Sequence, residues 1–417
     1  MASSDIKRRR SLTNVGGAVD TAGNREMAAL LAEALDVAPA PAPDSTSESD
    51  DADRAHVHGF HTYPARMHPT TAGRLVRALT REGATVFDPF CGSGTVLVEA
   101  MIAGRRAIGT DINPLAVRLA RLKSGRLDET VCASIVATAT EIATFADERR
   151  RRRAGSTRRY PREDVALFEP HVLLELDSLR AGIKEKSEDS VLRGALELVL
   201  SSILVKLSRQ ASDTSGALKP RRLAAGFPAR LFARKAEELV RRLGEMRALL
   251  PADLTAARVE VDDAMRLRTV QASTVDAVVA SPPYVATYDY VAQHELRMRW
   301  LDLDARPLLA GEMGARRRYA QLDARAAGEA WRRELTLSLR AMCRVCRKGA
   351  KVALLVADSA VQGEALRADV IVSAVALDSG LAWVARASQV RANFHGPGAL
   401  AFRDAPRAEH AIVLEKR

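Results

Sequence analysis

The stretch DAVVASPPYVATYDY, residues 276–290, contains the pattern that decides the fold. A run of small and apolar residues, typical of a buried strand, leads directly into Ser281-Pro282-Pro283-Tyr284. Proline fixes its own φ and lacks an N–H, and it also pushes the residue before it into extended geometry. The sequence therefore predicts a strand whose C-terminal end is followed by a stiff turn carrying a hydroxyl and an aromatic ring.

A second strand followed by a turn of distinctive sequence lies earlier in the chain. Residues 84–125 predict a strand, a Gly-rich turn, a helix, a second strand and a second helix, which is a βαβ unit of the nucleotide-binding kind. The turn, Phe90-x-Gly92-x-Gly94, lacks the Gly-Lys-Ser/Thr of a phosphate loop and the third glycine of a dinucleotide site. With Asp88 beside it and no basic residue, the turn suits a sulfonium cation with a free amino group.

Acidic residues end successive predicted strands. Asp111 ends the second strand, where a carboxylate can bind both hydroxyls of a ribose. Asp262 and Asp263 end the third strand, where one of them could accept a hydrogen bond from an adenine amino group. A single strand-end aspartate is often only a helix N-cap. Three such acids together with the Gly-rich turn point to a binding site.

Composition limits the classes of protein that fit. The chain has 417 residues, 47% of them hydrophobic, a formal charge of +11 and a pI near 9.8. That charge suits a polyanionic partner such as nucleic acid, or it reflects an Arg-rich genomic bias. No apolar run reaches the length of a membrane span and the N-terminus lacks the apolar core of a signal peptide, so a cytoplasmic protein is expected. Cys343 and Cys346 form a lone C-x-x-C within one predicted helix, and no metal site is predicted.

The predicted elements divide the chain into three parts. Residues 1–55 are expected to be a disordered tail, because Pro, Ala, Ser and acidic residues leave little to bury. Residues 56–125 and 256–417 carry the strand–helix alternation, ending in a strand pair. Residues 126–255 have helical spacing and no convincing strand, so a mostly helical insertion separates the two halves of an α/β domain.

Three motifs together resemble a known family. HTYPARMHP at residues 61–69, DPFCGSGT at 88–95 and SPPY at 281–284 resemble the S-adenosylmethionine-dependent DNA amino-methyltransferases that act on cytosine N4 or adenine N6. The resemblance covers roughly residues 58–125 and 257–417. It implies a Rossmann-like class I methyltransferase fold, a mainly parallel twisted sheet with a C-terminal antiparallel strand pair. It also implies S-adenosylmethionine as cofactor and double-stranded DNA as partner, and it leaves a cognate restriction endonuclease open as a further partner.

The resemblance assigns a cofactor site and a catalytic tetrapeptide. The residues expected to bind the cofactor are Tyr63, Pro64, Asp88, Pro89, Phe90, Gly92, Ser93, Gly94, Thr95, Asp111, Ile112, Asp262 and Asp263. In the tetrapeptide, which includes Pro283, the Ser281 side chain and the Pro282 carbonyl are expected to accept the hydrogens of an exocyclic amine. Tyr284 is expected to stack the base, which must leave the duplex to reach this pocket. Serine at the first position favours cytosine N4.

Further contacts with DNA are expected at two places. Asp289, Tyr290 and His294 follow the tetrapeptide, where they either line the pocket or pack a helix. In the insertion, taken as the target-recognition region, the candidates for DNA contact are Lys206, Arg209, Arg151 and Arg152. Each of these basic runs could instead be a solvated face or a polar helix cap.

Three rival functions stay open at this point. The first is the same chemistry on adenine N6, and the second is methylation of RNA. The third is a non-catalytic DNA-binding protein on a retained methyltransferase scaffold. The intact Ser281 and the Gly-rich turn speak against the third.

Overall fold

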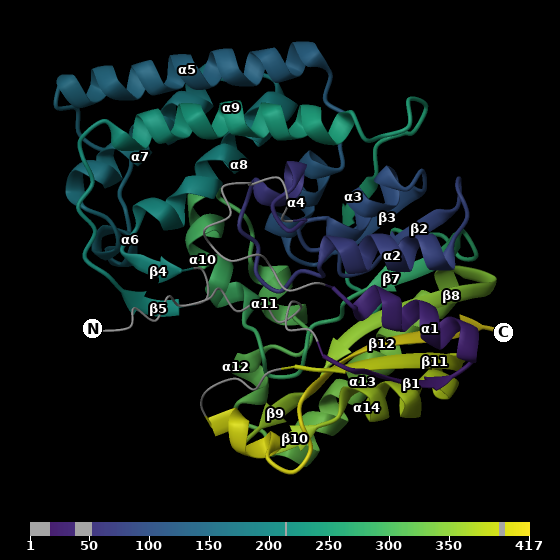
Figure 1. Ribbon diagram of the computed structural model, residues 1–417. Helices are drawn as coiled ribbons and strands as arrows, with labels where there is room; N and C mark the ends of the chain where they lie inside the picture. The colour runs from purple at the N-terminus through teal and green to yellow at the C-terminus, as the bar shows by residue number, and fades with distance from the viewer. Residues whose placement is uncertain (1–16, 38–51, 213–214, 392–396) are drawn as a thin grey trace, which may run out of the picture.

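The computed structural model describes residues 17–37, 52–212, 215–391 and 397–417. Its centre is an eight-stranded sheet with the strand order β1-β11-β12-β8-β7-β2-β3-β6 (Figure 1). The strands are β1 Val19–Gly23, β2 Thr85–Asp88, β3 Arg106–Asp111, β6 Arg258–Val261, β7 Val275–Ala280, β8 Cys346–Ala357, β11 Leu381–Val390 and β12 Ala408–Lys416.

The sheet is parallel where the cofactor motifs lie and antiparallel beyond them. β6, β3, β2, β7 and β8 run parallel to their neighbours. β12 lies antiparallel to both β8 and β11. The predicted C-terminal strand pair is therefore confirmed, and so is the predicted Rossmann-like methyltransferase fold with a mainly parallel sheet.

Helices cover both faces of the sheet because the central strands are apolar on both sides. Along β8, Val352, Leu354 and Val356 face one core cluster, while Ala353 and Leu355 face the other. The first cluster includes residues of α13 Ala324–Val345 and α14 Ala368–Ala376. The second cluster includes residues of α1 Arg25–Leu35, α2 Pro69–Leu79, α3 Thr95–Ile102 and α4 Pro114–Lys123.

Shorter elements connect these layers. They are the 3₁₀ segments η1 His56–Gly59, η2 Leu377–Ser379 and η3 Pro397–Phe402, the helices α10 Tyr290–Trp300, α11 Arg306–Gly311 and α12 Arg316–Tyr319, and the hairpin of β9 Ser359–Val361 with β10 Glu364–Leu366. The segment from α10 to α12 follows β7 and therefore lies beside the C-terminal ends of the parallel strands.

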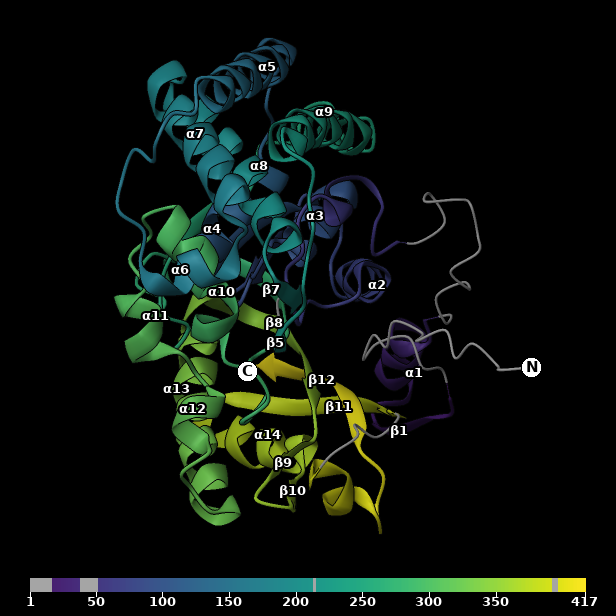
Figure 2. The same cartoon turned by 90° about the vertical axis from the view of Figure 1, so that its left-hand side faces the viewer.

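The insertion is a helical layer that stands apart from the sheet (Figures 1 and 2). Its helices are α5 Glu129–Arg151, α6 Arg162–Leu167, α7 Pro170–Lys186, α8 Ser190–Leu207 and α9 Phe227–Arg247. On α5 the buried Ile135, Ala139, Ile142 and Ala146 recur every three or four residues, which places them on one helix face. A hairpin of β4 Gln210–Ser212 and β5 Ser215–Leu218 was not expected from the sequence.

The expectation of a disordered N-terminal tail is wrong for residues 17–37. β1 pairs with β11 at the edge of the sheet, and α1 buries Ala28, Leu31, Ala34 and Leu35. Asn24 caps this helix by accepting a hydrogen bond from the Met27 amide. The Pro-, Ala- and acid-rich composition that suggested a tail lies mainly in residues 38–51, and these, with residues 1–16, lie outside the described residues.

The cysteines and the hydrophobicity of the helices were the subject of two further sequence expectations. All four cysteines are free, and Cys343 lies in α13 while Cys346 opens β8. The C-x-x-C therefore crosses a helix–strand junction and does not lie in one helix. Among the helices that the structure describes, none combines the length and the hydrophobicity that a membrane crossing requires.

Candidate active site

A cavity lies at the C-terminal ends of the parallel strands, where ligands of open α/β sheets bind. It encloses about 650 Å³, open space at its mouth included. The residues that line it are Tyr63, Ala65, Pro89, Phe90, Gly92, Asp111, Ile112, Asn113, Asp263, Ala264, Met265, Ser281, Pro283, Tyr290, Leu308, Gly311, Glu312 and Met313. The predicted cofactor turn and the predicted catalytic turn thus face one cavity.

The Gly-rich turn is held by backbone geometry that glycine allows. Gly92 has φ +49° and Gly94 has φ +89°, and the latter caps α3. A Cβ on Gly92 would lie 3.2 Å from the Tyr63 ring, and one on Gly94 would lie 3.1 Å from Ala120. The turn therefore passes close to Tyr63, and Tyr63 in turn accepts a hydrogen bond of 3.3 Å from the Asn113 side chain.

Asp111 organises the floor of the cavity. Its carboxylate accepts hydrogen bonds from the Gly92 amide (2.9 Å) and the Asn113 amide (2.8 Å). Burial raises the pKa of Asp111 to about 6, although these two hydrogen bonds oppose the shift. Each oxygen keeps a second acceptor position. The side chain can therefore hold the Gly-rich turn and still accept two hydroxyl groups from a ligand.

The neighbouring Asp88 differs from Asp111 in its surroundings. It ends β2 and accepts one hydrogen bond, from the Phe90 amide at 3.0 Å. Burial raises its pKa to about 8. Asp88 does not line the cavity, so its effect on a ligand runs through the shape of the turn.

The two acids after β6 have separate roles. Asp263 lines the cavity and accepts a hydrogen bond from the Met265 amide at 2.9 Å. Asp262 is buried, and one of its oxygens accepts both the amide and the hydroxyl of Thr269 at 2.7 Å. Asp263 is therefore the acid available to a ligand, and Asp262 shapes the loop.

Three other predicted cofactor residues lie behind the cavity wall. The hydroxyls of Ser93 and Thr95 are buried and have no hydrogen-bond partner among the described residues. Pro64 is not among the lining residues, and the adjacent Ala65 takes that place with φ +55°. Pro89, Phe90 and Ile112 line the cavity as predicted.

The catalytic turn presents two of its four residues to the cavity. Ser281 and Pro283 line it, whereas Pro282 and Tyr284 are buried. The Tyr284 hydroxyl donates a hydrogen bond of 3.1 Å to Glu409, which also pairs with Arg391 at 2.7 Å. The ring of Tyr284 therefore packs into the protein, which differs from the stacking face that the sequence led us to expect.

Tyr290 supplies the aromatic ring that Tyr284 does not. It lines the cavity, and its ring lies 6.5 Å from that of Tyr63 at an interplanar angle of 20°. His294 stacks on Tyr63 at 4.8 Å and is fully buried. Burial lowers the pKa of His294 to about 3, and Arg297 adds to the shift. His294 is thus a neutral packing residue, whereas Tyr290 lines the cavity together with Tyr63 and Phe90.

Asp289 and the basic residues of the insertion do not line the cavity. Asp289 caps α10 and pairs with Arg317 at 2.9 Å. The other four lie on the helical insertion. Arg209 pairs with Glu169 at 2.8 Å and Arg151 pairs with Asp147 at 2.8 Å, while Lys206 and Arg152 are exposed. The structure therefore separates the basic residues from the cavity.

Helix α11 and the residues directly after it form a wall of the cavity that the sequence did not reveal. Leu308, Gly311, Glu312 and Met313 line it. A Cβ on Gly311 would lie 2.4 Å from the Ile112 side chain, so the backbone of α11 passes directly over that residue. The sequence carries no motif at these positions, since their approach depends on how the chain after β7 folds back.

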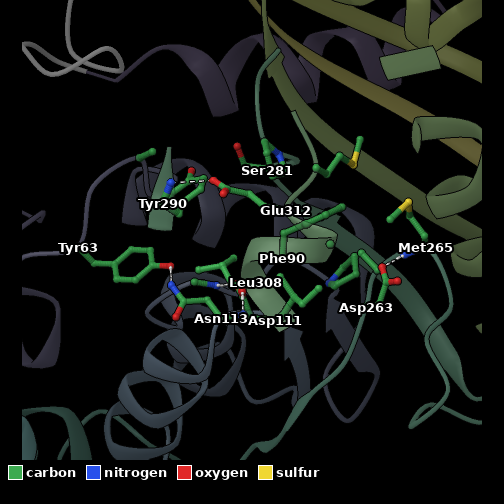
Figure 3. Close-up of a pocket in the computed structure, with 18 residues that line it drawn as sticks. Tyr63, Phe90, Asp111, Asn113, Asp263, Met265, Ser281, Tyr290, Leu308 and Glu312 are labelled. Carbon is green, nitrogen blue, oxygen red and sulfur yellow. Dashed lines mark hydrogen bonds between the residues drawn. The ribbon is translucent and has the colours of Figure 1, made fainter. Parts of the chain in front are cut away.

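The charges of the cavity are all of one sign. Its 18 described lining residues include three carboxylates, those of Asp111, Asp263 and Glu312, and no Lys, Arg or His (Figure 3). A phosphate would be repelled by this lining. A ligand with ribose hydroxyls, an aromatic base and a positive charge matches it.

Two groups of side chains elsewhere have the composition of metal ligands. His56, His58 and Glu99 lie together near α3, with a 2.9 Å contact between His58 and Glu99. Asp358, Asp369 and His410 form the second group. In the second group, Arg367 and two backbone amides also bind Asp358. Both groups lie apart from the residues of the cavity.

The family model that matches this chain covers the stretch with the Gly-rich turn. Residues 40–122 match the family model N6_N4_Mtase, described as DNA methylase. The Type II methyltransferase M.MvaI of Kocuria varians is 41% identical over 71 residues, which are 16% of each chain. M.MjaII of Methanocaldococcus jannaschii is 37% identical over 73 residues, or 18% of this chain and 14% of that one.

A relative with another substrate matches over a similar length. The tRNA (guanine(10)-N2)-dimethyltransferase of Methanothermobacter thermautotrophicus is 39% identical over 61 residues, 14% of this chain and 18% of that one. The chain thus aligns with less than a fifth of each of these curated relatives. The strand order is that of a Rossmann-like α/β fold, with a cavity at the C-terminal ends of its parallel strands. The segment that contains the Gly-rich turn is similar to the N6/N4 DNA methylases, and this similarity supports S-adenosylmethionine as the cofactor.

Proposed function

We propose that this chain transfers a methyl group from S-adenosylmethionine to the exocyclic amine of a base in double-stranded DNA, and that cytosine N4 is the acceptor. The observation that carries the proposal is the shared cavity, which is lined by Gly92 of the cofactor turn and Asp111 at the end of β3 and also by Ser281 and Pro283 of the catalytic turn. A donor and an acceptor bound on these two sides meet without any further movement of the strands.

The chain's own residues fit the cofactor. When bound, S-adenosylmethionine supplies an activated methyl group on a positively charged sulfur. Asp111 would accept the ribose hydroxyls, and Asp263 would accept from the adenine amino group. Ile112 and Met265 offer apolar contact. The acidic lining favours the cationic donor over the neutral product, so the same charges assist product release.

The catalytic turn would activate a weak nucleophile. The lone pair of an exocyclic amine is delocalised into the base, and acceptors on its two hydrogens draw the nitrogen towards a tetrahedral geometry. The Ser281 hydroxyl and the Pro282 carbonyl are the two acceptors in this proposal. Because Pro283 follows Pro282, the geometry before it is restricted and the carbonyl is held in one orientation.

The target base would be held by Tyr290. A base inside a duplex cannot reach a cavity at the strand ends, so it must be flipped out. Stacking on an aromatic ring contributes about 1–3 kcal/mol per base. Tyr290 lines the cavity whereas Tyr284 is directed into the protein, and this difference supports Tyr290 in the role.

The helical insertion would supply the contacts with the rest of the duplex. Lys206 and Arg152 are exposed on it, and Arg151 is exposed apart from its pair with Asp147. Such side chains neutralise phosphates and set the register of the protein on DNA. Arg209 is held by Glu169 and would need to exchange that partner to reach DNA.

Methylation of duplex DNA in vitro, followed by nucleoside mass spectrometry, tests the proposal. We expect N4-methylcytosine; N6-methyladenine alone would contradict the choice of base. Ser281→Ala should lower the rate of transfer by about tenfold to a hundredfold, since one hydrogen bond to a developing charge contributes about 1.5–3 kcal/mol. Calorimetry should show cofactor affinity unchanged in this variant.

Methylation of RNA is the second candidate, because one relative acts on tRNA. The same assay with labelled methyl groups should be run with tRNA and with duplex DNA at equal nucleotide concentration. Transfer to tRNA and not to DNA would replace the proposed substrate. Transfer to neither, with the cofactor bound, would favour a DNA-binding protein without catalytic activity.

A further inference from the structure

Glu312 is a carboxylate of the cavity that no motif identifies. It follows α11, is only 2% exposed, and lines the cavity together with Ser281 and Tyr290. Figure 3 shows these three side chains along one side of the cavity, with Asp111 and Asn113 along the other. One oxygen of Glu312 accepts a hydrogen bond of 2.7 Å from the Tyr290 amide. Glu312 therefore belongs to the side of the cavity where the target base would lie.

The backbone fixes Glu312 beside the catalytic turn. Gly314 has φ +64°, and a Cβ there would lie 3.2 Å from the carbonyl oxygens of Pro283 and Tyr284. The Ala286 amide donates to the Gly314 carbonyl at 3.0 Å, and the Arg316 amide donates to the Tyr288 carbonyl at 2.8 Å. The segment that carries Glu312 is thus hydrogen-bonded to the segment that follows Ser281.

Arg317 restrains the carboxylate from outside the cavity. It forms ion pairs with Glu312 and, at 2.9 Å, with Asp289, and it donates to the Leu309 carbonyl at 3.0 Å. Tyr290 and Arg317 each occupy one of the two oxygens of Glu312. A carboxylate has about four acceptor positions, so two remain.

Other groups in the cavity are poorly suited to take a proton from the target. Asp111 is bound to the Gly92 and Asn113 amides on the cofactor side. Asp263 is bound to the Met265 amide and lies 3.5 Å from Arg266. The hydroxyl of Ser281 can accept a hydrogen bond but is far too weak a base to keep a proton.

We propose that Glu312 is a catalytic residue: its carboxylate takes the proton that the target amine, held by Ser281 and Pro282, loses on methylation. This role rests on the proposed amino-methyltransferase function. As the bond between the amine nitrogen and the methyl carbon forms, the carbon–sulfur bond of the donor breaks and sulfur keeps its electron pair. The nitrogen then carries the positive charge, and one N–H proton passes to Glu312 and later to solvent.

The charges around Glu312 set the pH at which this can occur. Burial raises the pKa of Glu312, Arg317 opposes the shift through its ion pair, and Asp289 adds to it. Asp111 also lies near enough for the two carboxylates to affect each other. The ionised form is the one that accepts the proton, so transfer should slow as the pH falls through the raised pKa of Glu312.

Single-turnover methylation at saturating cofactor tests this role. Glu312→Gln keeps an acceptor for the Tyr290 amide but cannot take a proton. We expect its rate to fall by about a hundredfold, within the usual range for a general base, while the calorimetric affinity for the cofactor stays within twofold. The pH–rate profile of Glu312→Gln should lose the fall in rate at acidic pH that titration of Glu312 causes in the wild type. A fall in rate that both proteins show is assigned to Asp111 or Asp88.

Glu175→Gln is the matched control. Glu175 is also a buried carboxylate that accepts a hydrogen bond of 2.7 Å from a backbone amide, that of Gly226, but it does not line the cavity. Its variant should keep the rate within threefold. An equal loss in both variants, or a Glu312→Gln loss that appears wholly in cofactor affinity, would overturn the proposal.

Two further results keep the test decisive. If Glu312→Gln has a lowered melting temperature, Glu312→Asp retains a base and should keep an acidic limb with a reduced rate; an absent limb would overturn the role. A wild-type chain that methylates no nucleic acid would overturn the proposed function itself. An active wild type with an equally active Glu312→Gln would overturn the role of Glu312 alone.

Discussion

The two sides of the cavity are built in different ways. On the cofactor side, Asp111 holds Gly92 and Asn113 through hydrogen bonds to backbone amides, all within residues 92–113. On the base side, Ser281 meets Tyr290 and Glu312, which reach it only because the chain after β7 folds back on itself. The first side is built from contacts between residues near in sequence, and the second depends on tertiary packing. Variants on the cofactor side should therefore lose cofactor affinity, whereas variants on the base side should lose target engagement or turnover.

The largest effect is expected on the cofactor side. Asp111→Ala removes the acceptor for two ribose hydroxyls and also frees the Gly92 amide. We expect the cofactor dissociation constant to rise by about a hundredfold or more, because two hydrogen bonds to a charged group contribute about 3 kcal/mol or more together. Isothermal titration calorimetry measures it. An unchanged affinity would break the distinction between the two sides.

A smaller effect is expected from the aromatic residues of the base side. Tyr290→Ala should weaken target engagement by about tenfold to a hundredfold, the range that base stacking provides, and leave cofactor affinity unchanged. Tyr284→Phe should instead lower the free energy of unfolding by about 1–3 kcal/mol, because Glu409 loses a buried partner, with turnover preserved. Methylation kinetics and urea unfolding distinguish them. The reverse pattern would restore Tyr284 as the stacking residue.

The smallest effect is expected from pH. The ionised form of Asp111 binds the hydroxyls, and its pKa is about 6, so cofactor affinity should fall by about tenfold between pH 7 and pH 5. The contribution of Asp111 to the stability of the free protein should instead increase as the pH falls over the same range. The folded state binds the Asp111 proton more tightly than the unfolded chain does, so this group destabilises the fold as pH rises towards 6. Asp111→Asn should flatten the calorimetric pH profile.

The same contrast explains what the sequence could predict. The Gly-rich turn, Asp111 and Ser281 lie in short motifs whose geometry is set by neighbouring residues, and the structure brings all of them to one cavity. The parallel strands with their terminal antiparallel pair followed from alternation of strands and helices. These features need no knowledge of distant contacts.

The rest depends on contacts between distant segments. Whether Tyr284 turns inwards is decided by Glu409 on β12, and Glu312 has no signal until α11 packs over Ile112. Asp262 and Asp263 are adjacent in sequence, and only the position of Thr269 separates their roles. The strand β1 was missed because five residues at a sheet edge carry little pattern of their own.

The position of β1 has a consequence for how the chain folds. Val19 pairs with Gln389, so one of the first strands to be synthesised must wait for one of the last. Until β11 emerges, β1 lacks the strand with which it pairs, and α1 lacks its contacts with that strand. Pairings of such large sequence separation are slow to form and leave strand edges exposed in the meantime. We expect the parallel half of the sheet to fold first, with the N-terminal strand closing the edge as a late step.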